Sequence, residues 1–335
     1  MKRFLNKTDK KYFLRNFVIF LVVFTIVLIP LNVALGKLGG VRLFSGTDSI
    51  MDDMDYIIDP DSPFYEDFKN SERVNVLLLG VNDGLTDVIM VGSYDLKNQR
   101  VDIITVPRDT YYYRSQYKGA AWMKINSIYH SEGVVRTAEA VSDVLLGMPI
   151  NYYVVVDYDA VRAIVDEMGG VPIDIPFTMK YDDPYDTPPL HIYFEKGPTV
   201  LSGDDAVKYL RYRKGYSQGD IGRIGAHQEF VKSAFKQALD HGVVDVAKVA
   251  FDEIESDITL DMIVKIAGKA ALLDSENVYT WLTPGGSGMA NGASYWYADT
   301  DETEDMIDRI YNFEDYIETD AEGGEGGDAE GGAAE

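Results

Sequence analysis

The sequence predicts an α/β protein, namely a three-layer α/β/α domain around a central mixed sheet, preceded by one transmembrane helix. Three observations lead to this prediction. Short runs rich in Val and Ile alternate with stretches of helical spacing from residue 74 to residue 318, which is typical of a sheet covered by helices on both faces. Residues 17–35 form an uncharged apolar run. Residues 319–335 contain too few apolar side chains to fold.

The N-terminal segment predicts a membrane anchor. Residues 1–16 carry six basic side chains against one acid. Residues 17–35 (FVIFLVVFTIVLIPLNVAL) are long enough to cross about 30 Å of hydrocarbon as a helix. The positive-inside rule places residues 1–16 in the cytoplasm and everything after residue 36 outside the cell, as expected for a single-pass protein of the cell membrane. A cleaved signal peptide is the alternative, although the apolar stretch is longer than a typical signal core.

Three further segments follow the expected anchor. Residues 36–72 are rich in Asp and Glu from residue 44 onward and lack periodicity, so we expect an acidic, solvated stalk. Residues 73–318 form the expected folded domain. Residues 319–335 (TDAEGGEGGDAEGGAAE) are expected to be a disordered tail rich in Gly and acids.

Strands are predicted where short runs rich in Val and Ile are bounded by turn residues. They are expected at residues 74–81, 88–94, 101–106, 152–157, 171–175 and 277–283. Helices are predicted by apolar residues that recur every three or four positions and by N-cap and glycine stop signals, such as the N-cap Ser202. They are expected at residues 134–147, 160–168, 202–213, 222–241, 243–253, 259–273 and 301–318. On the first of these helices, Val135, Ala138, Val141 and Leu145 are expected to share one face.

Composition excludes several classes of function. A formal net charge of -24 argues against nucleic acid as a partner, because an acidic surface repels a phosphate polyanion. The chain has no cysteine, which excludes disulfides and thiolate metal sites, and its four histidines are too few for a persuasive zinc site. The 23 tyrosines suit either sugar-facing grooves or simply a tyrosine-rich surface.

A first candidate site lies where two predicted strands end in polar residues. Asn82, Asp83 and Asp87 flank the apolar runs near residue 80, and Arg108 and Asp109 follow the third predicted strand. Ligands gather at strand ends in α/β sheets, and oxygen ligands suit a hard cation such as Mg²⁺. A structural Arg108–Asp109 ion pair and a turn-capping Asp87 are the simpler alternatives.

A second candidate site follows the helix predicted at 202–213. Arg211, Arg213, Lys214 and Arg223 supply four basic groups within thirteen residues, together with Asp220. Arginine can hold phosphate oxygens through two parallel hydrogen bonds. These side chains could also complement the negative end of the helix. Taken with the first site, they predict a Mg²⁺–pyrophosphate site.

At these residues the sequence resembles the LytR-CpsA-Psr family of membrane-anchored cell-wall ligases. The resemblance covers nearly all of residues 74–290 and follows the family's order. The matching stretches are VNVLLLGVNDGLTDVIMV, VDIITVPRDTYY, KINSIYH, LLGMPINYYVVVDYDAVRAIVDEMGGVPIDIP, YDDP, LHIYFEKGPTVLSGDDAVKYLRYRK, GDIGRIGAHQEF and YTWLTPGG.

The resemblance implies that a polyprenyl pyrophosphate lies with its tail in an apolar tunnel and its head on arginines and Mg²⁺, with Mn²⁺ as an alternative ion. Asp87 matches the family's metal-binding and catalytic aspartate, and Asp220 matches its second conserved acid. Lys124 and Asn126 match a Lys-Ile-Asn element and are expected to bind substrate. The expected pyrophosphate clamp consists of Arg108, Arg211, Arg213 and Arg223, of which Arg108 and Arg223 are also expected to act in catalysis.

The implied reaction moves a phosphorylated glycopolymer, such as teichoic acid or capsule, from its polyprenyl-pyrophosphate carrier to a peptidoglycan sugar hydroxyl on a Gram-positive cell. Two alternatives remain: a polyprenyl-pyrophosphate pyrophosphatase, or a non-catalytic regulator that binds the lipid or the wall polymer. The sequence departs from the family at Asn82, Leu85, Ala226 and His227, where an acid, Arg, Arg and Gln are usual. Because Asn82 replaces an acid, the metal ligands are expected to be Asp87 with Asn82 and Asp83.

Overall fold

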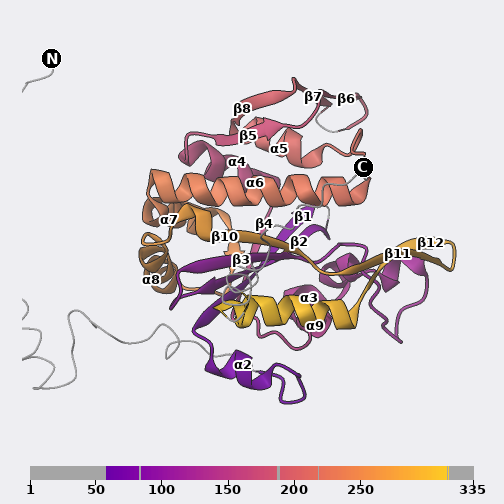
Figure 1. The fold of residues 1–335 in the computed structure, drawn as a ribbon. Coiled ribbons are helices and arrows are strands. Elements are labelled where there is room, and N and C mark those ends of the chain that lie inside the picture. The colour runs from indigo at the N-terminus through magenta and orange to yellow at the C-terminus, as the bar shows by residue number, and fades with distance from the viewer. Residues whose placement is uncertain (1–57, 83, 187–188, 218, 315, 317–335) are drawn as a thin grey trace, which may run out of the picture. The chain divides into compact units, whose positions relative to one another are not determined.

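The computed structural model describes residues 58–316 except 83, 187–188, 218 and 315 (Figure 1). These residues belong to one compact unit, Asp53–Glu335. The expected cytoplasmic tail, the expected transmembrane helix at 17–35, most of the expected stalk and the C-terminal tail lie outside the described residues. Within the part that is described, no helix is both long and apolar enough to cross a membrane.

A six-stranded mixed sheet forms the centre of the domain, in the order β10-β3-β2-β1-β4-β9. Strands β1, β2 and β3 are antiparallel neighbours, whereas β4 runs parallel to β1 and β10 runs parallel to β3. The sheet strands are β1 (Arg73–Asn82), β2 (Leu85–Asp95), β3 (Arg100–Thr105), β4 (Tyr152–Val156), β9 (Glu255–Ser256) and β10 (Val278–Leu282). The predicted fold class is confirmed.

Alternating side chains bury both faces of this sheet, as expected for apolar strands between two helical layers. Leu77 and Leu79 of β1 point into one core, while Leu78 points to the opposite face. The first core is closed by α3 (Ile128–Val144) and α9 (Thr300–Tyr311), which lie along the same side of the sheet in Figure 1. The opposite face is covered by α6 (Asp220–His241) and α8 (Leu260–Ala270).

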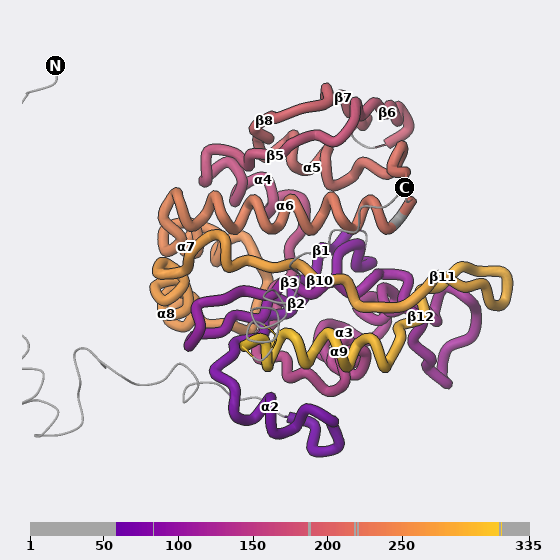
Figure 2. Tube along the Cα trace, in the orientation of Figure 1, coloured from indigo at the N-terminus to yellow at the C-terminus, as the bar shows by residue number. Residues whose placement is uncertain are grey.

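A second core lies on the far side of α6 from the sheet, around strands β5 to β8 and helices α4 and α5 (Figure 2). It is built on Tyr209, Phe230 and other apolar side chains. Its elements are α4 (Tyr158–Glu167), β5 (Val171–Ile175), β6 (Met179–Asp183), β7 (Leu190–Phe194), β8 (Gly197–Leu201) and α5 (Gly203–Arg211), with α7 (Val243–Glu253) adjoining. Strand β5 pairs with β8, and β6 pairs with β7.

The expected strands and helices of the domain are all present, and the N-cap Ser202 accepts a hydrogen bond from the Asp205 amide at 3.3 Å. The β6–β7 hairpin, strands β8 and β9, and the hairpin of β11 (Gly285–Ala290) and β12 (Ala293–Ala298) were not expected. On α3 the expected face is wrong at Val135, which is 65% exposed, because at about 100° per residue it lies about 120° around the helix from the buried Val141.

The described end of the expected stalk also differs from the expectation. Residues Tyr65–Asn70 form helix α2, and Phe64 and Phe68 are buried in the core that α3 and α9 close. The Phe68 ring packs edge-on against Tyr311 of α9, with ring centroids 4.8 Å apart. The segment just before β1 is therefore packed onto the domain, because its two phenylalanines bury apolar surface in the core. This helix was missed by sequence reasoning because the residues around the phenylalanines are acidic.

Candidate active site

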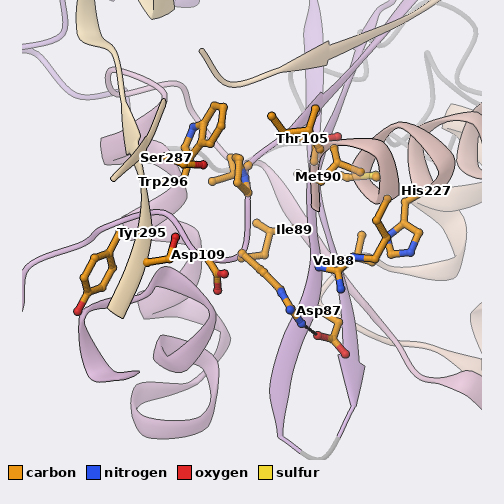
Figure 3. A pocket seen from close by; sticks show the side chains of 17 residues that line it. Asp87, Val88, Ile89, Met90, Thr105, Asp109, His227, Ser287, Tyr295 and Trp296 are labelled. Carbon is orange, nitrogen blue, oxygen red and sulfur yellow. Dashed lines mark hydrogen bonds and ion pairs between the residues drawn. The ribbon is translucent and has the colours of Figure 1, made fainter. Parts of the chain in front are cut away.

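The β1–β2 hairpin and the chain that follows β3 bring the central carboxylate and its first arginine together. Asp87 lies near the start of β2 at a register shift: Gly80 pairs with Val88 and Val81 pairs with Thr86, so Asp87 has no partner residue on β1. A Cβ atom on Gly80 would lie 2.9 Å from the Cβ atom of Val88, so only glycine permits this approach of the two strands. Arg108, three residues after the end of β3, donates from Nη1 to Asp87 Oδ1 (Figure 3).

A second arginine reaches the same carboxylate from the second core. Arg213 Nη2 lies 3.3 Å from Asp87 Oδ2, so each oxygen of Asp87 faces one arginine. Arg213 follows α5, and its side chain is 56% exposed, which leaves it accessible to a ligand. The Nε of Arg108 is buried without a hydrogen-bond partner among the described residues. The exposed guanidinium of Arg213 can therefore donate to an added anion, whereas Arg108 Nε is buried.

The remaining predicted arginines lie close to this cluster but not on Asp87. Arg211, in the last turn of α5, pairs with Asp186 and lies over the Tyr158 ring, 5.5 Å from its centroid. Arg223, in the first turns of α6, is buried and lines a small cavity together with Asp87 and Arg108. Asp186 was missed by sequence reasoning because it lies in a loop between two unexpected strands, 25 residues from Arg211.

The structure separates two residues that the sequence places side by side. Arg108 pairs with Asp87, whereas Asp109 pairs with Lys124 at 3.1 Å, so a structural Arg108–Asp109 ion pair is not formed. In Figure 3, Asp109 lies between the strand that carries Tyr295 and the central strands. The backbone N–H of Asn126 donates to the backbone carbonyl of Arg108 at 3.2 Å, which holds the Lys-Ile-Asn segment against the site.

An apolar cavity of about 300 Å³ opens beside Asp87, between the sheet and helices α4, α6 and α7. Asn82, Asp87 and Tyr158 are among its few polar lining residues, and the rest of the lining is almost wholly apolar. The wall residues include Leu78, Val88, Val161, Ile164, Val165, Met168, Leu210, Phe230, Val231, Ala234, Phe235, Ala238 and Val246. The expected apolar tunnel beside the charged site is therefore matched by a cavity of suitable chemistry.

His227 lies between this cavity and the small cavity at Arg108, and it lines both. Its ring Nε2 lies 3.0 Å from the Leu210 carbonyl, which makes Nε2–H the donor. Burial lowers the pKa of His227 from 6.5 to about 4, because the imidazolium form would lose its hydration. The histidine that replaces the family's usual glutamine is thus neutral near pH 7 and does not add a charge to the apolar wall.

The residues predicted to bind metal are only partly described. Asn82 and Asp87 both line the apolar cavity, whereas Asp83 and the side chain of Asp220 lie outside what the structure describes. Among the described residues, no group of three or more His, Asp or Glu side chains is placed to hold a metal ion. Mg²⁺ usually needs one or two carboxylates and completes its octahedron with water and phosphate oxygens. Asp87 and Asn82 fit such an ion only when a phosphate ligand is also present.

The family assignment follows from a model of the LytR_cpsA_psr family, which matches residues 45–311. The chain belongs to this family. Polyisoprenyl-teichoic acid–peptidoglycan teichoic acid transferase TagU of Bacillus anthracis (strain CDC 684 / NRRL 3495) is 29% identical over 260 residues, which cover 73% of this chain and 80% of that protein. The corresponding transferase TagV of Bacillus subtilis (strain 168) is 30% identical over 200 residues, covering 56% of this chain and 50% of that protein. The match therefore spans half the length of that TagV.

Solved structures agree with the fold of this family member. The crystal structure of B. subtilis TagV has a TM-score of 0.60 at 25% identity and covers 71% of this chain and 96% of that one. The structure of TagT bound to LI-WTA has a TM-score of 0.58 at 19% identity and covers 73% of this chain and 91% of that one. At that identity the second likeness supports the α/β fold and nothing more.

Proposed function

We propose that this protein transfers a phosphorylated glycopolymer from a polyprenyl-pyrophosphate carrier to a sugar hydroxyl of peptidoglycan. The observation that carries the proposal is the apolar cavity lined in part by Asp87, whose two carboxylate oxygens face Arg108 and Arg213. A polyprenyl chain needs an apolar cavity, and its pyrophosphate needs several cations at the cavity mouth. The relatives named as teichoic acid transferases support the same reaction.

In this reaction the sugar hydroxyl attacks the phosphorus next to the glycopolymer. A new O–P bond forms, the P–O bond to the bridging oxygen breaks, and polyprenyl phosphate leaves with the electron pair. Arg108, Arg213 and Arg223 stabilise the charge that builds on the bridging and non-bridging oxygens. The hydroxyl proton passes to a carboxylate, for which Asp87 and Asp220 are the candidates from the sequence.

We further propose that Mg²⁺ takes part in substrate binding. Asp87 and the Asn82 amide oxygen would hold it, and Mn²⁺ could replace it. When bound, the ion neutralises charge on the pyrophosphate. The chain's own contribution is to hold Arg108 and Arg213 on Asp87 beside the apolar cavity, so that the phosphates meet fixed donors.

The proposed location is the outer face of a Gram-positive cell membrane, with residues 17–35 as a single span and the domain outside. The basic residues before that run and the lipid substrate support this placement. A protease applied to intact protoplasts should remove the domain. Survival of the domain until the cells are lysed would contradict the orientation.

Product analysis with the full-length chain tests the reaction itself. The substrate is a polyprenyl-pyrophosphate-linked disaccharide with a labelled sugar, supplied with peptidoglycan and Mg²⁺. Transfer places the label on insoluble peptidoglycan, hydrolysis releases it as a soluble glycosyl phosphate, and a non-catalytic lipid-binding regulator leaves it on the lipid. Label on peptidoglycan is the expected result, and either other distribution would contradict the transferase function.

A cavity-filling variant tests the lipid site. Ala234→Phe adds a ring to the wall of the apolar cavity and should raise the KM for the lipid donor. Ala271→Phe, on an exposed alanine just after α8, is the matched control and should resemble the wild type. An unchanged donor KM in Ala234→Phe would place the lipid tail elsewhere.

A further inference from the structure

An open cavity of about 580 Å³ lies beyond Arg108 from the apolar cavity. It is bounded by the chain after β3, by the short 3-10 helices Ala120–Met123 and Ile125–Ser127, and by the start of β12. Arg108 and Asp109 line both this cavity and the small cavity that contains Asp87. It shares no lining residue with the apolar cavity. The Asp87–Arg108 ion pair therefore lies between the two cavities: Asp87 lines the apolar cavity, and Arg108 lines the open cavity.

The lining of this cavity has the chemistry of a sugar site. Trp122 offers a partly exposed indole, stacked on Tyr117 with ring centroids 5.2 Å apart and 21° between the planes. Asp109, Lys124, Asn126 and His130 add hydrogen-bonding groups around it. A pyranose presents an apolar C–H face and a rim of hydroxyls, which match a flat aromatic body flanked by polar side chains.

The segment that carries Trp122 is held in place from behind. Arg114, whose side chain is buried, donates to the Trp122 carbonyl and to Ser127 Oγ, both at 2.7 Å. It also pairs with Glu132 of α3, and its guanidinium lies 4.4 Å from the Tyr117 ring centroid. A cavity wall fixed in this way loses little conformational entropy when a ligand binds.

We propose that this cavity is the acceptor subsite, which holds a pyranose of the wall glycan against Trp122 with one hydroxyl directed to Asp109. The proposal rests on the proposed transferase function. In phosphoryl transfer the attacking and leaving oxygens lie roughly in line through phosphorus. Since the lipid phosphate leaves toward the apolar cavity, the attacking hydroxyl must approach from the side of Arg108 that this cavity occupies. Asp109 orients that hydroxyl by accepting its hydrogen bond.

Two variants change the cavity in opposite ways. Trp122→Ala removes the indole on which the sugar would stack. Ala121→Tyr places a large side chain at an exposed position of the cavity wall and keeps Trp122 in place. Tyr113→Ala is the matched control, because Tyr113 is a 64% exposed aromatic residue on the same segment that does not line the cavity. Melting temperatures of all three variants verify that they fold.

The kinetic test uses the full-length chain in detergent, a polyprenyl-pyrophosphate-linked disaccharide as donor, and uncross-linked glycan strands of N-acetylglucosamine and N-acetylmuramic acid as acceptor. Both cavity variants should raise the acceptor KM about tenfold, the upper range for loss of an aromatic contact. The donor KM and the rate of hydrolysis without acceptor should stay within about twofold of the wild type. A rise in donor KM with an unchanged acceptor KM would assign the cavity to the donor's sugar and overturn the proposal.

A binding measurement separates this proposal from the transferase function. The same glycan strands are titrated into the full-length chain without any donor. Weaker binding in Trp122→Ala and Ala121→Tyr, but not in Tyr113→Ala, supports the subsite even if the wild type transfers nothing. Equal binding by all four proteins would refute it, whatever the outcome of the product analysis.

Discussion

Replacing His227 by glutamine should make the protein more resistant to acid. His227 is buried between the two cavities at the active site, and burial lowers its pKa from 6.5 to about 4. In the unfolded chain the same histidine takes up a proton near pH 6.5. Between these two values the unfolded state binds more protons than the folded state, so stability falls as the pH falls through this window.

The size of the effect follows from the two pKa values. Going from pH 8 to pH 5, this one group should lower the free energy of unfolding by about 2 kcal/mol, and by about 3 kcal/mol at pH 4. Glutamine cannot take up the proton, yet its amide N–H can still donate to the Leu210 carbonyl as Nε2 does at 3.0 Å. His227→Gln should therefore lose that part of the pH dependence.

Urea unfolding of wild type and variant at pH 8, 6 and 5 measures the difference. The matched control is His241→Gln, which removes an exposed histidine from the other end of α6. The difference in unfolding free energy between wild type and His227→Gln should change by about 2 kcal/mol between pH 8 and pH 5. If that difference is the same at every pH, His227 is not held neutral by burial and the reasoning fails.

Three further predictions follow from the site and the core. Arg213→Ala should lower the transfer rate about ten- to a hundredfold, because one charge-assisted contact to phosphate is lost, and Arg213→Lys should rescue it poorly; full activity would remove Arg213 from the clamp. Asn82→Asp should lower, and Asp87→Asn raise, the Mg²⁺ concentration needed for half-maximal activity, and identical Mg²⁺ titrations would contradict ligation by these residues. Asp102→Ala should cost about 3–5 kcal/mol in urea unfolding, because it removes the buried carboxylate that pairs with Arg100 at 2.7 Å, whereas Arg73 keeps Asp95 at 3.4 Å; a loss below 1 kcal/mol would contradict this.

The main elements of the domain could be predicted from the sequence because their signals are local. The runs at β1, β2 and β3 are apolar on both faces, which only a sheet between two helical layers satisfies. The N-cap Ser202 sets the start of α5 through its own side chain. Strands β6 (MKYDD) and β11 (GGSGMA) could not be found this way, because they are short and rich in polar residues or glycine. Strands β7 (LHIYF) and β12 (ASYWYA) do carry apolar and aromatic residues typical of strands, but they were missed by sequence reasoning.

Resemblance and charge pattern sufficed to select Asp87, Arg108, Arg211, Arg213 and Arg223 as candidates. The sequence also determined that an apolar run of 19 residues precedes an acidic domain without cysteine. Both results need only residue identity and order, since charge, hydropathy and motif spacing are properties of the chain itself.

Only the tertiary structure decided how these groups pair. Asp87 accepts from Arg108 and Arg213, which are 21 and 126 residues away, while the adjacent Asp109 turns to Lys124. The apolar cavity is likewise built from strands and helices that lie far apart along the chain, and so is the cavity beyond Arg108 that we propose as the acceptor subsite. Pairings and cavities of this kind depend on how layers pack and where backbones approach, as at Gly80, and no local sequence pattern records those distances.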